Sequence, residues 1–353
     1  MGFKVCIVGA GAIGGFIGAR LAAGGVAEVS ALARGATLAA LRQHGWRLQE
    51  NASLVQMAAH ASDDAATLGR QDLVIIAVKA QALPELVPKL APLLGARSLV
   101  LPAMNGVPWW FSAAVPALGA EPLASVDPGG GIARAIAFSQ VLGCVVHLSC
   151  STPEPGLVQR RMGQGLIIGE PLGDPGAANG ATTGATGATG ASGAGAAATG
   201  GSERIRRVAE VLRSGRLEVT VSADVKRDVW YKLWGNLTMN PVSAITGATI
   251  ERVLGDDLVR EFCSAAMREA ALVGEKIGCP VEQSPEDRHA VTARLGAFKT
   301  SMLQDVQAGR TIELDAIVTA VHEVARRVDV PTPLIDGLLG ITRLFARGRG
   351  LYP

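Results

Sequence analysis

Several features that mark other classes of protein are missing from this 353-residue sequence. No apolar run reaches the roughly 20 residues of a membrane-spanning helix, although the mean hydropathy is positive at +0.29. The net charge is only +2 and no Lys/Arg-rich run occurs, which leaves little basis for nucleic-acid binding. Neither Gly-x-Ser-x-Gly nor His-Glu-x-x-His is present, so the sequence lacks the motifs of serine hydrolases and zinc proteases.

Cysteine and histidine are also sparse and widely scattered. The cysteine count is odd and includes no Cys-x-x-Cys pair, so the sequence indicates neither a disulfide framework nor a zinc site. The five cysteines are Cys6, Cys144, Cys150, Cys263 and Cys279, and the five histidines are His44, His60, His147, His289 and His322. The first 15 residues lack the basic start and the Ala-x-Ala site of a secretory signal. We expect a metal-free, cytoplasmic protein with no membrane segment.

The length corresponds to about two domains at roughly 150 residues each. Short β-branched segments alternate with helical ones in the first part of the chain. Strands are predicted at residues 3–9, 28–33, 72–78, 98–101 and 142–148, helices at 12–23 and 37–43, and a hairpin or strand pair at 157–169. Continuous apolar strands between helices indicate a parallel sheet that is covered on both faces.

The character of the chain changes twice beyond residue 174. Residues 175–201 are almost entirely Gly, Ala, Thr and Ser, which indicates a flexible surface insertion. After Val221 only helices are predicted, at residues 224–239, 256–277, 285–307, 313–328 and 333–346, with Ser284 and Thr332 as N-caps before prolines. The predicted organisation is an α/β domain over residues 1–222 and an all-helical domain over residues 223–353.

A Gly-x-Gly-x-x-Gly motif lies between the first predicted strand and the first predicted helix. It consists of Gly9, Ala10, Gly11, Ala12, Ile13 and Gly14. The first glycine permits a tight turn, the second lets a pyrophosphate approach the backbone, and the third permits close helix packing. The helix N-terminus then binds the phosphates. Because the motif stands in this strand–turn–helix context, we favour a Rossmann-type dinucleotide site over a merely tight turn.

The residue that would select the cofactor is Arg34. Proteins that bind NAD carry an acidic residue about 20 positions beyond the last glycine, where it binds the ribose 2′-hydroxyl. Here Arg34 follows the second strand, and Glu28 lies too early. A guanidinium at this position favours a 2′-phosphate, so we predict NADP(H); an ordinary solvated arginine is the competing interpretation.

Two further sites follow predicted strands. Lys79 comes directly after strand 72–78, and Asn105-Gly106 comes after strand 98–101. Open α/β sheets bind ligands at the carboxyl ends of their strands, which makes these residues site candidates. A solvated lysine and a turn-forming Asn-Gly are equally good interpretations of the same residues.

The most informative segment is 228–241, in which Lys232, Asn236 and Asn240 recur every fourth residue. At 3.6 residues per turn they form one polar stripe, which borders an apolar face with Trp230. Partial burial beside aromatic side chains would bring the pKa of Lys232 toward the working range of a general acid. A surface lysine with two capping asparagines is the alternative, because Pro241 can end or kink the helix at Asn240.

Two residues of the later helices are unremarkable when taken singly. Ser301 begins the segment Ser-Met-Leu-Gln-Asp within a predicted helix, and Glu313 opens the next helix. Any helical serine would fit the first position, and an acidic residue favours the N-terminal end of a helix dipole at the second.

Taken together and in this order, the motifs resemble those of the ketopantoate reductase (2-dehydropantoate 2-reductase) family over nearly the whole chain. The resemblance rests on the Gly9–Gly14 loop, Val78-Lys79-Ala80, Asn105-Gly106, the segment 230–236 with Asn240-Pro241, the segment 301–305, and Glu313. It implies a Rossmann-type domain followed by an all-α domain like the C-terminal domain of 6-phosphogluconate dehydrogenase.

The resemblance also implies an activity, namely NADPH-dependent reduction of 2-dehydropantoate to pantoate in pantothenate biosynthesis. Lys232 would donate the proton, and Glu313 would hold that lysine and contact the cofactor or the new hydroxyl. By the same resemblance Asn105, Asn236, Asn240 and Ser301 would bind substrate, and Lys79, Asn105, Glu313 and the Ser149 backbone would contact NADPH. Helical second domains of related dehydrogenases often take part in dimers, so a homodimer is possible by analogy.

The chain departs from the family pattern at one substrate position. A further asparagine expected some ten residues after Asn240 falls on Ile250. This departure favours one alternative to 2-dehydropantoate reduction, an NADPH-dependent reductase of another branched 2-oxo acid. A non-catalytic NADP-binding redox sensor is a separate alternative.

Overall fold

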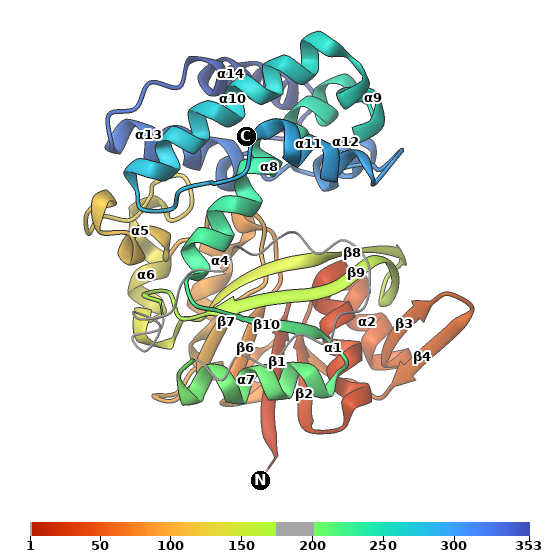
Figure 1. Cartoon of the computed structure of the whole chain (residues 1–353). Coiled ribbons are helices and arrows are strands. Elements are labelled where there is room, and N and C mark those ends of the chain that lie inside the picture. The colour runs from red at the N-terminus through yellow and green to blue at the C-terminus, as the bar shows by residue number, and fades with distance from the viewer. Residues whose placement is uncertain (1, 174–200) are drawn as a thin grey trace.

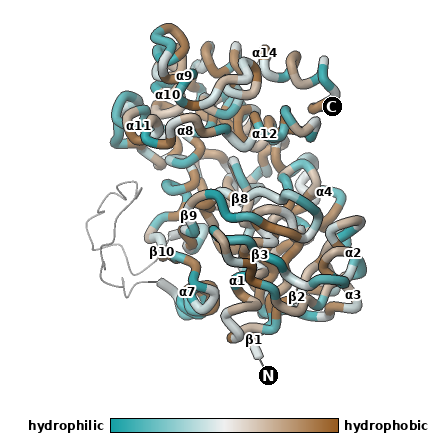
Figure 2. Tube along the Cα trace, turned by 90° about the vertical axis from the view of Figure 1, so that its right-hand side faces the viewer, coloured by the Kyte–Doolittle hydropathy of each residue, from teal (hydrophilic) through white to brown (hydrophobic). Residues whose placement is uncertain are grey.

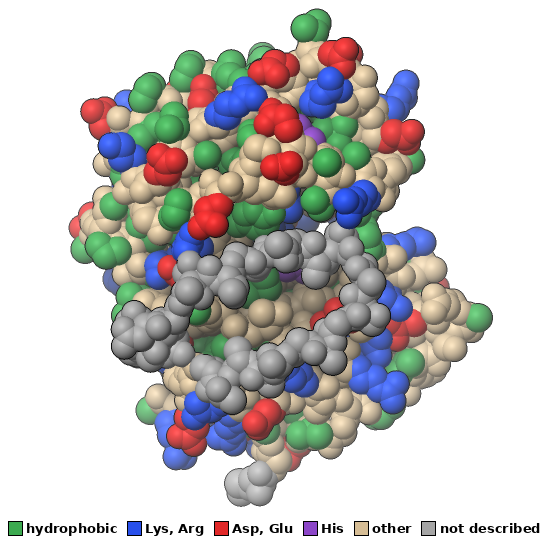
Figure 3. Space-filling view, in the orientation of Figure 1, with side chains coloured by type: hydrophobic (Ala, Val, Ile, Leu, Met, Phe, Trp, Pro, Cys, Tyr) green, Lys and Arg blue, Asp and Glu red, His purple; other side chains and the backbone are tan. Residues whose placement is uncertain are grey.

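The computed structural model of the chain describes residues 2–173 and 201–353, so the predicted insertion lies outside the described residues apart from Gly201. The described residues form two lobes, and helix α8 (Val225–Thr246) extends from the lower lobe into the upper one (Figure 1). The strands lie in the lower lobe and helices α9 to α14 in the upper lobe (Figure 1). The side view separates the labelled elements in the same way (Figure 2), and the space-filling view is indented at its right side between the two lobes (Figure 3). Among the described residues no helix is both long and apolar enough to cross a membrane.

The parallel sheet of the lower lobe confirms the predicted α/β fold. Its strands are β1 (Phe3–Val8), β2 (Ala27–Leu32), β5 (His60–Ser62), β6 (Leu73–Ile76) and β7 (Leu99–Pro102). Their order is β5-β2-β1-β6-β7, with parallel pairing throughout. All of β6 is buried, as expected for an apolar strand with neighbours on both sides. The carboxyl ends of these strands meet at one edge, which is where the predicted site residues follow.

A second sheet stands beside the first, and it corrects one prediction. It contains β3 (Trp46–Glu50), β4 (Ser53–Met57), β8 (Gly143–Glu154), β9 (Leu157–Gly169) and β10 (Glu218–Ser222). Residues 157–169 were predicted as a hairpin or strand pair, which is wrong. They form one strand that pairs antiparallel with β8, because the turn falls earlier, at Gly156, whose φ is +71°. The β3–β4 hairpin was not predicted at all.

The helices of the lower lobe flank these sheets. They are α1 (Ala12–Gly24), α2 (Gly35–His44), α3 (Ala65–Leu68), α4 (Leu83–Leu86), α5 (Phe111–Ala114), α6 (Gly131–Ala135) and α7 (Glu203–Ser214). Helix α1 contacts strands of both sheets. A Cβ on Gly18 would lie 2.4 Å from the Trp46 ring, so the small residues of α1 permit this close packing.

The upper lobe is helical, as predicted, but with different boundaries. Beyond α8 it contains α9 (Ile250–Gly255), α10 (Asp257–Lys276), α11 (Pro285–Ala293), α12 (Ser301–Gln307), a π-helical turn (Asp315–Thr319), α13 (Ala320–Arg327) and α14 (Pro333–Arg347). The single helix predicted over residues 285–307 is two helices, since Gly296 has a φ of +61° and Thr300 caps α12. Ser284 and Thr332 are the N-cap residues of α11 and α14, as predicted, but only the side chain of Ser284 accepts a capping hydrogen bond.

Helix α8 continues through Pro241 to Thr246, so Asn240 does not mark its end. Its second half is buried against α10 and α12, and this packing outweighs the backbone hydrogen bond that a proline removes. The indole N–H groups of Trp230 and Trp234 donate to backbone carbonyls of α10, at 3.2 and 2.7 Å. Helix α8 is therefore a rigid support, and the predicted division at residues 222 and 223 falls between β10 and this helix.

Candidate active site

The turn between β1 and α1 has the geometry that the glycine motif requires. Gly9 has a φ of +92°, and a Cβ on Gly14 would lie 2.1 Å from the Gly9 carbonyl oxygen. At Gly11, in contrast, a Cβ would meet nothing within 4 Å. The backbone of Gly11 thus borders open space in front of the α1 N-terminus. The turn fits a dinucleotide, because this is the place where a pyrophosphate would lie.

Arg34 lies along the same edge of the sheet. It is the N-cap residue of α2, directly after β2, and its side chain is exposed. No ion pair of the Arg34 guanidinium occurs within the described part of the chain. Since β2 pairs with β1 in parallel, Arg34 and the Gly9 turn stand next to each other at the strand ends. The arginine is therefore free to meet a negative charge beside the glycine turn.

Lys79 also stands at this edge, but its ammonium group contacts the upper lobe. Its Nζ lies 2.8 Å from Asp305 Oδ2 and donates to the Thr311 carbonyl over 2.6 Å. The side chain of Gln81 donates to Thr311 Oγ1 over 3.1 Å. Segment 79–81 thus joins the two lobes, an interaction that no local sequence pattern indicates. The predicted contact of Lys79 with a cofactor stays a prediction.

The polar stripe on α8 faces the ends of strands in the lower lobe. Lys232 Nζ donates to the Val146 carbonyl of β8 over 2.9 Å. One turn later Asn236 Nδ2 donates to Asn105 Oδ1 over 3.1 Å. Asn240 is buried, and its Nδ2 has no hydrogen-bond partner among the described residues. The structure therefore joins the stripe to Asn105 through Asn236, and it leaves the buried amide of Asn240 without a hydrogen-bond acceptor among the described residues.

The surroundings of Lys232 change its acidity. Burial lowers the pKa of Lys232 to about 8, Glu313 opposes this shift, and the charge of Arg288 adds to it. A pKa of about 8 leaves a substantial fraction of both protonation states at neutral to mildly alkaline pH, as proton transfer requires. A lowered pKa of Lys232 is the direction predicted from the aromatic neighbours of the stripe.

Glu313 acts electrostatically on Lys232 and also contacts the lower lobe. The Ala80 amide donates to Glu313 Oε1 over 3.3 Å. Burial raises the pKa of Glu313, while this amide and the charge of Lys79 act in the opposite direction. Glu313 thus belongs to the group around Lys232, although no hydrogen bond directly joins their side chains among the described contacts.

A close backbone contact holds the Asn105 loop against the segment after Glu313. The Val107 amide donates to the Ala316 carbonyl over 2.7 Å, and a Cβ on Gly106 would stand 2.3 Å from that oxygen. Gly106 also has a φ of +80°, so a glycine is required there for two reasons. Ala316 lies in the π-helical turn, a feature often found at functional sites.

The remaining predicted residues are less closely connected. Ser301 is exposed at the first position of α12, which packs against α8. Ser149 is half-buried in β8, opposite Met162 of β9. Ile250 is buried in a small apolar cluster at the start of α9, so this position offers no polar group.

Sequence reasoning missed Arg288 and the role of His147. The ring of His147 reaches solvent, yet the protein around it, followed by the charges of Lys232 and Arg288, lowers the pKa of His147 to about 4. The charge of Arg288 therefore acts on both His147 and Lys232. The glycine at position 235, which permits the approach of Arg288, was the one signal for it in the sequence.

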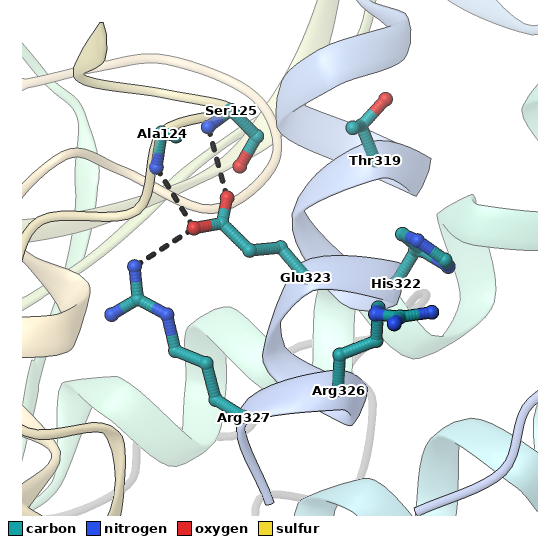
Figure 4. A pocket seen from close by; sticks show the side chains of 7 residues that line it. All are labelled: Ala124, Ser125, Thr319, His322, Glu323, Arg326 and Arg327. Carbon is teal, nitrogen blue, oxygen red and sulfur yellow. Dashed lines mark hydrogen bonds and ion pairs between the residues drawn. The ribbon is translucent and has the colours of Figure 1, made fainter. Parts of the chain in front are cut away.

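A separate hollow of about 550 Å³ lies elsewhere, between α13 and residues 124–125. Figure 4 shows Glu323 at its wall. The Glu323 carboxylate accepts hydrogen bonds from the backbone amides of Ala124 and Ser125, each over 2.9 Å, and from the side chain of Arg327. None of the predicted site residues lines this hollow. The engagement of Glu323 with backbone amides indicates that the carboxylate holds the two lobes together.

Comparisons with known proteins show the family of the chain. The family model described as "Ketopantoate reductase PanE/ApbA" matches residues 5–173, and the model of that family's C-terminal part matches residues 224–346. A 2-dehydropantoate 2-reductase of Mesorhizobium japonicum is 38% identical over 351 residues, covering 99% of both chains. The chain belongs to the ketopantoate reductase family.

Solved structures place this family member among oxidoreductases that share its fold. A Ralstonia solanacearum MolK2 protein assigned to the ketopantoate reductases is 47% identical, with a TM-score of 0.88 and full coverage of both chains. D-mandelate dehydrogenase, solved with NADH and anilino(oxo)acetate, has a TM-score of 0.77 at 18% identity and covers 99% of this chain and 100% of its own. The predicted fold class and family are thus confirmed, and the ketopantoate reductase family is one of dinucleotide-binding reductases.

Proposed function

We propose that the protein reduces 2-dehydropantoate to pantoate with NADPH, with Lys232 as the proton donor, in pantothenate synthesis. The observation that carries the proposal is the position of Lys232, whose pKa is lowered to about 8 and which lies on the same α8 face as Asn236, itself bonded to Asn105. The 38% identical relative bears the same activity in its name.

In this proposal the polar groups of the site divide into those that transfer the proton, those that bind the substrate and those that bind the cofactor. When bound, the reduced nicotinamide supplies the hydride that adds to the keto carbon. Lys232 donates a proton from Nζ to the oxygen, which becomes the hydroxyl, and its charge stabilises the developing alkoxide. Glu313 supports the charged state of Lys232. Asn105, Asn236, Asn240 and Ser301 bind the substrate, while the 9–14 turn, Arg34, Lys79 and the Ser149 backbone hold NADPH.

The direct test is NADPH oxidation with 2-dehydropantoate and with a panel of other 2-oxo acids under identical conditions. We expect turnover on 2-dehydropantoate to exceed that on the other acids. The buried Ile250, found where an asparagine is expected, favours a second candidate, a reductase of another branched 2-oxo acid. Turnover confined to another acid would establish that candidate, and NADPH binding without any turnover would establish a redox sensor.

Cofactor preference is expected to depend on Arg34. The unaltered protein should prefer NADPH to NADH. Arg34→Ala should lower the ratio of KM for NADH to KM for NADPH about tenfold or more, because the contact between the guanidinium and the 2′-phosphate is lost. Arg70→Ala removes the same charge from the opposite end of β6 and serves as the control. Equal use of NADH and NADPH by the unaltered protein would contradict the prediction.

The pH dependence of the reaction is expected to follow the pKa of Lys232. Reduction requires the protonated amine, so kcat/KM should be level below pH 8 and fall about tenfold per pH unit above it. Oxidation of the hydroxy acid requires the neutral amine and should rise over the same range. Glu313, Arg288 and His147 also surround the amine, so the profile of each direction should be measured with cofactor affinity recorded at every pH. A level reduction profile up to pH 9.5 would contradict the assignment.

Assembly and location are also part of the proposal. All five cysteines lie in the described regions as free thiols, which suits a reducing compartment such as the cytoplasm. A ketopantoate reductase from Staphylococcus aureus is described as dimeric. We propose a homodimer for this chain as well, to be checked by its mass in solution.

A further inference from the structure

The guanidinium of Arg288 lies beside the polar stripe without a carboxylate partner. Its Cζ stands 4.9 Å from the centroid of the Tyr231 ring, and Nη1 donates to Tyr231 Oη over 3.2 Å. The neighbouring acid, Asp287, accepts a hydrogen bond from the hydroxyl of Ser284 instead. Within residues 2–173 and 201–353 no ion pair of Arg288 is present. The Tyr231 ring thus holds the half-buried guanidinium in place, and the positive charge of Arg288 is not neutralised by an acidic side chain among the described residues.

Gly235 creates the space for this arrangement. A Cβ at Gly235 would lie 3.0 Å from Arg288 Nε, closer than ordinary van der Waals contact. Gly235 falls between Lys232 and Asn236 in the sequence and adjoins the stripe on the surface of α8. The Nε atom is buried and has no hydrogen-bond partner among the described residues. Arg288 therefore lies against the backbone of α8, next to the groups that surround the proton donor.

The local balance of charge is positive. Arg288 acts electrostatically on both Lys232 and His147, so the three side chains share one neighbourhood. His147, with its pKa lowered to about 4, is neutral near pH 7, so Lys232 and Arg288 are the groups that carry positive charge there. Glu313 is the one carboxyl group among the described side chains that act electrostatically on Lys232, so two basic groups, Lys232 and Arg288, face one acid there. Such surroundings suit an anionic ligand.

We propose that Arg288 binds the carboxylate of the 2-oxo acid substrate, while Lys232 serves the adjacent keto oxygen. This inference rests on the proposed function. In a 2-oxo acid the carboxylate is bonded directly to the carbon that is reduced, so it must lie close to Lys232. A guanidinium can donate two parallel hydrogen bonds to a carboxylate, which fixes the orientation of the keto group as well as its charge. Arg288 thereby selects 2-oxo acids over uncharged ketones.

The test compares variants on a matched pair of substrates. Arg288→Gln should raise KM about 10- to 100-fold for the 2-oxo acid that the unaltered protein reduces best, with NADPH affinity unchanged. For the carboxamide of the same acid, which carries no charge, KM should be the same in the variant and the unaltered protein. Arg288→Lys retains the charge and should give an intermediate KM. Arg294→Gln, on the exposed end of the same helix segment, is the control and should resemble the unaltered protein.

A second variant tests the position of the guanidinium without altering its charge. Gly235→Ala should displace Arg288 and raise KM for the acid but not for the carboxamide, and it stays informative if Arg288→Gln folds poorly. Equal losses on the acid and the carboxamide would show a merely structural role and overturn the inference. Unchanged KM for the acid in Arg288→Gln would overturn it as well, while leaving the proposed function intact. Absence of 2-oxo acid turnover by the unaltered protein would overturn both.

Discussion

Replacing Lys232 with alanine is expected to lower kcat about 10²- to 10⁴-fold, the usual loss when a general acid is removed. NADPH affinity should stay nearly the same, because the Lys232 ammonium donates to the Val146 carbonyl of β8, and none of its described hydrogen bonds involves the glycine turn. Steady-state kinetics measure kcat, and a fluorescence titration with NADPH measures the affinity for the cofactor.

Lys226→Ala provides the matched control for this experiment. Lys226 lies on the same helix, where its ammonium pairs with Asp224 at 3.0 Å, so its loss removes an equal charge away from the stripe. Its kcat should be within a few-fold of that of the unaltered protein. Unchanged kcat in Lys232→Ala would remove Lys232 from the mechanism.

The second large effect is expected at the glycine turn, where two alanine substitutions should behave in opposite ways. Gly11 has a φ of −78° and open space at its Cβ position, so Gly11→Ala should fold normally. We expect it to weaken NADPH binding at least tenfold, because the added methyl group enters the volume that the pyrophosphate requires. Thermal unfolding without cofactor and a binding titration give the two values.

Gly14→Ala is expected to act on stability first. Its methyl group would stand 2.1 Å from the Gly9 carbonyl oxygen and 2.9 Å from the Ile7 side chain. Overpacking of this kind costs about 1–3 kcal/mol of unfolding free energy. For the other variant, Gly11→Ala, a normal NADPH affinity would show that the cofactor phosphates do not bind at this glycine turn.

The sequence was sufficient where a local pattern determines the structure. The apolar strand β6 and the glycine turn could be predicted because each depends on side-chain periodicity or on backbone freedom within a few residues. The stripe on α8 was predicted for the same reason, since residues four apart share a helix face. The direction of the Lys232 pKa shift followed from its aromatic neighbours.

Long-range packing explains what could not be predicted. Pro241 would end an isolated helix, and only the burial of α8 against α10 and α12 lets the helix continue. The ion pair between Lys79 and Asp305 joins residues 226 positions apart, and no local pattern indicates it. The placement of Arg288 depends on both Gly235 and Tyr231, which lie on another helix.

The apolar core has a consequence for how the molecule folds. One buried cluster contains Trp110 and Phe111 of the lower lobe together with Trp230 and Trp234 of α8, and the rings of Phe111 and Trp230 stack at 6.1 Å. Neither lobe closes this cluster with its own side chains alone. The two lobes therefore depend on each other for their stability, and the helix that carries Lys232 is ordered by the same cooperative step that joins them.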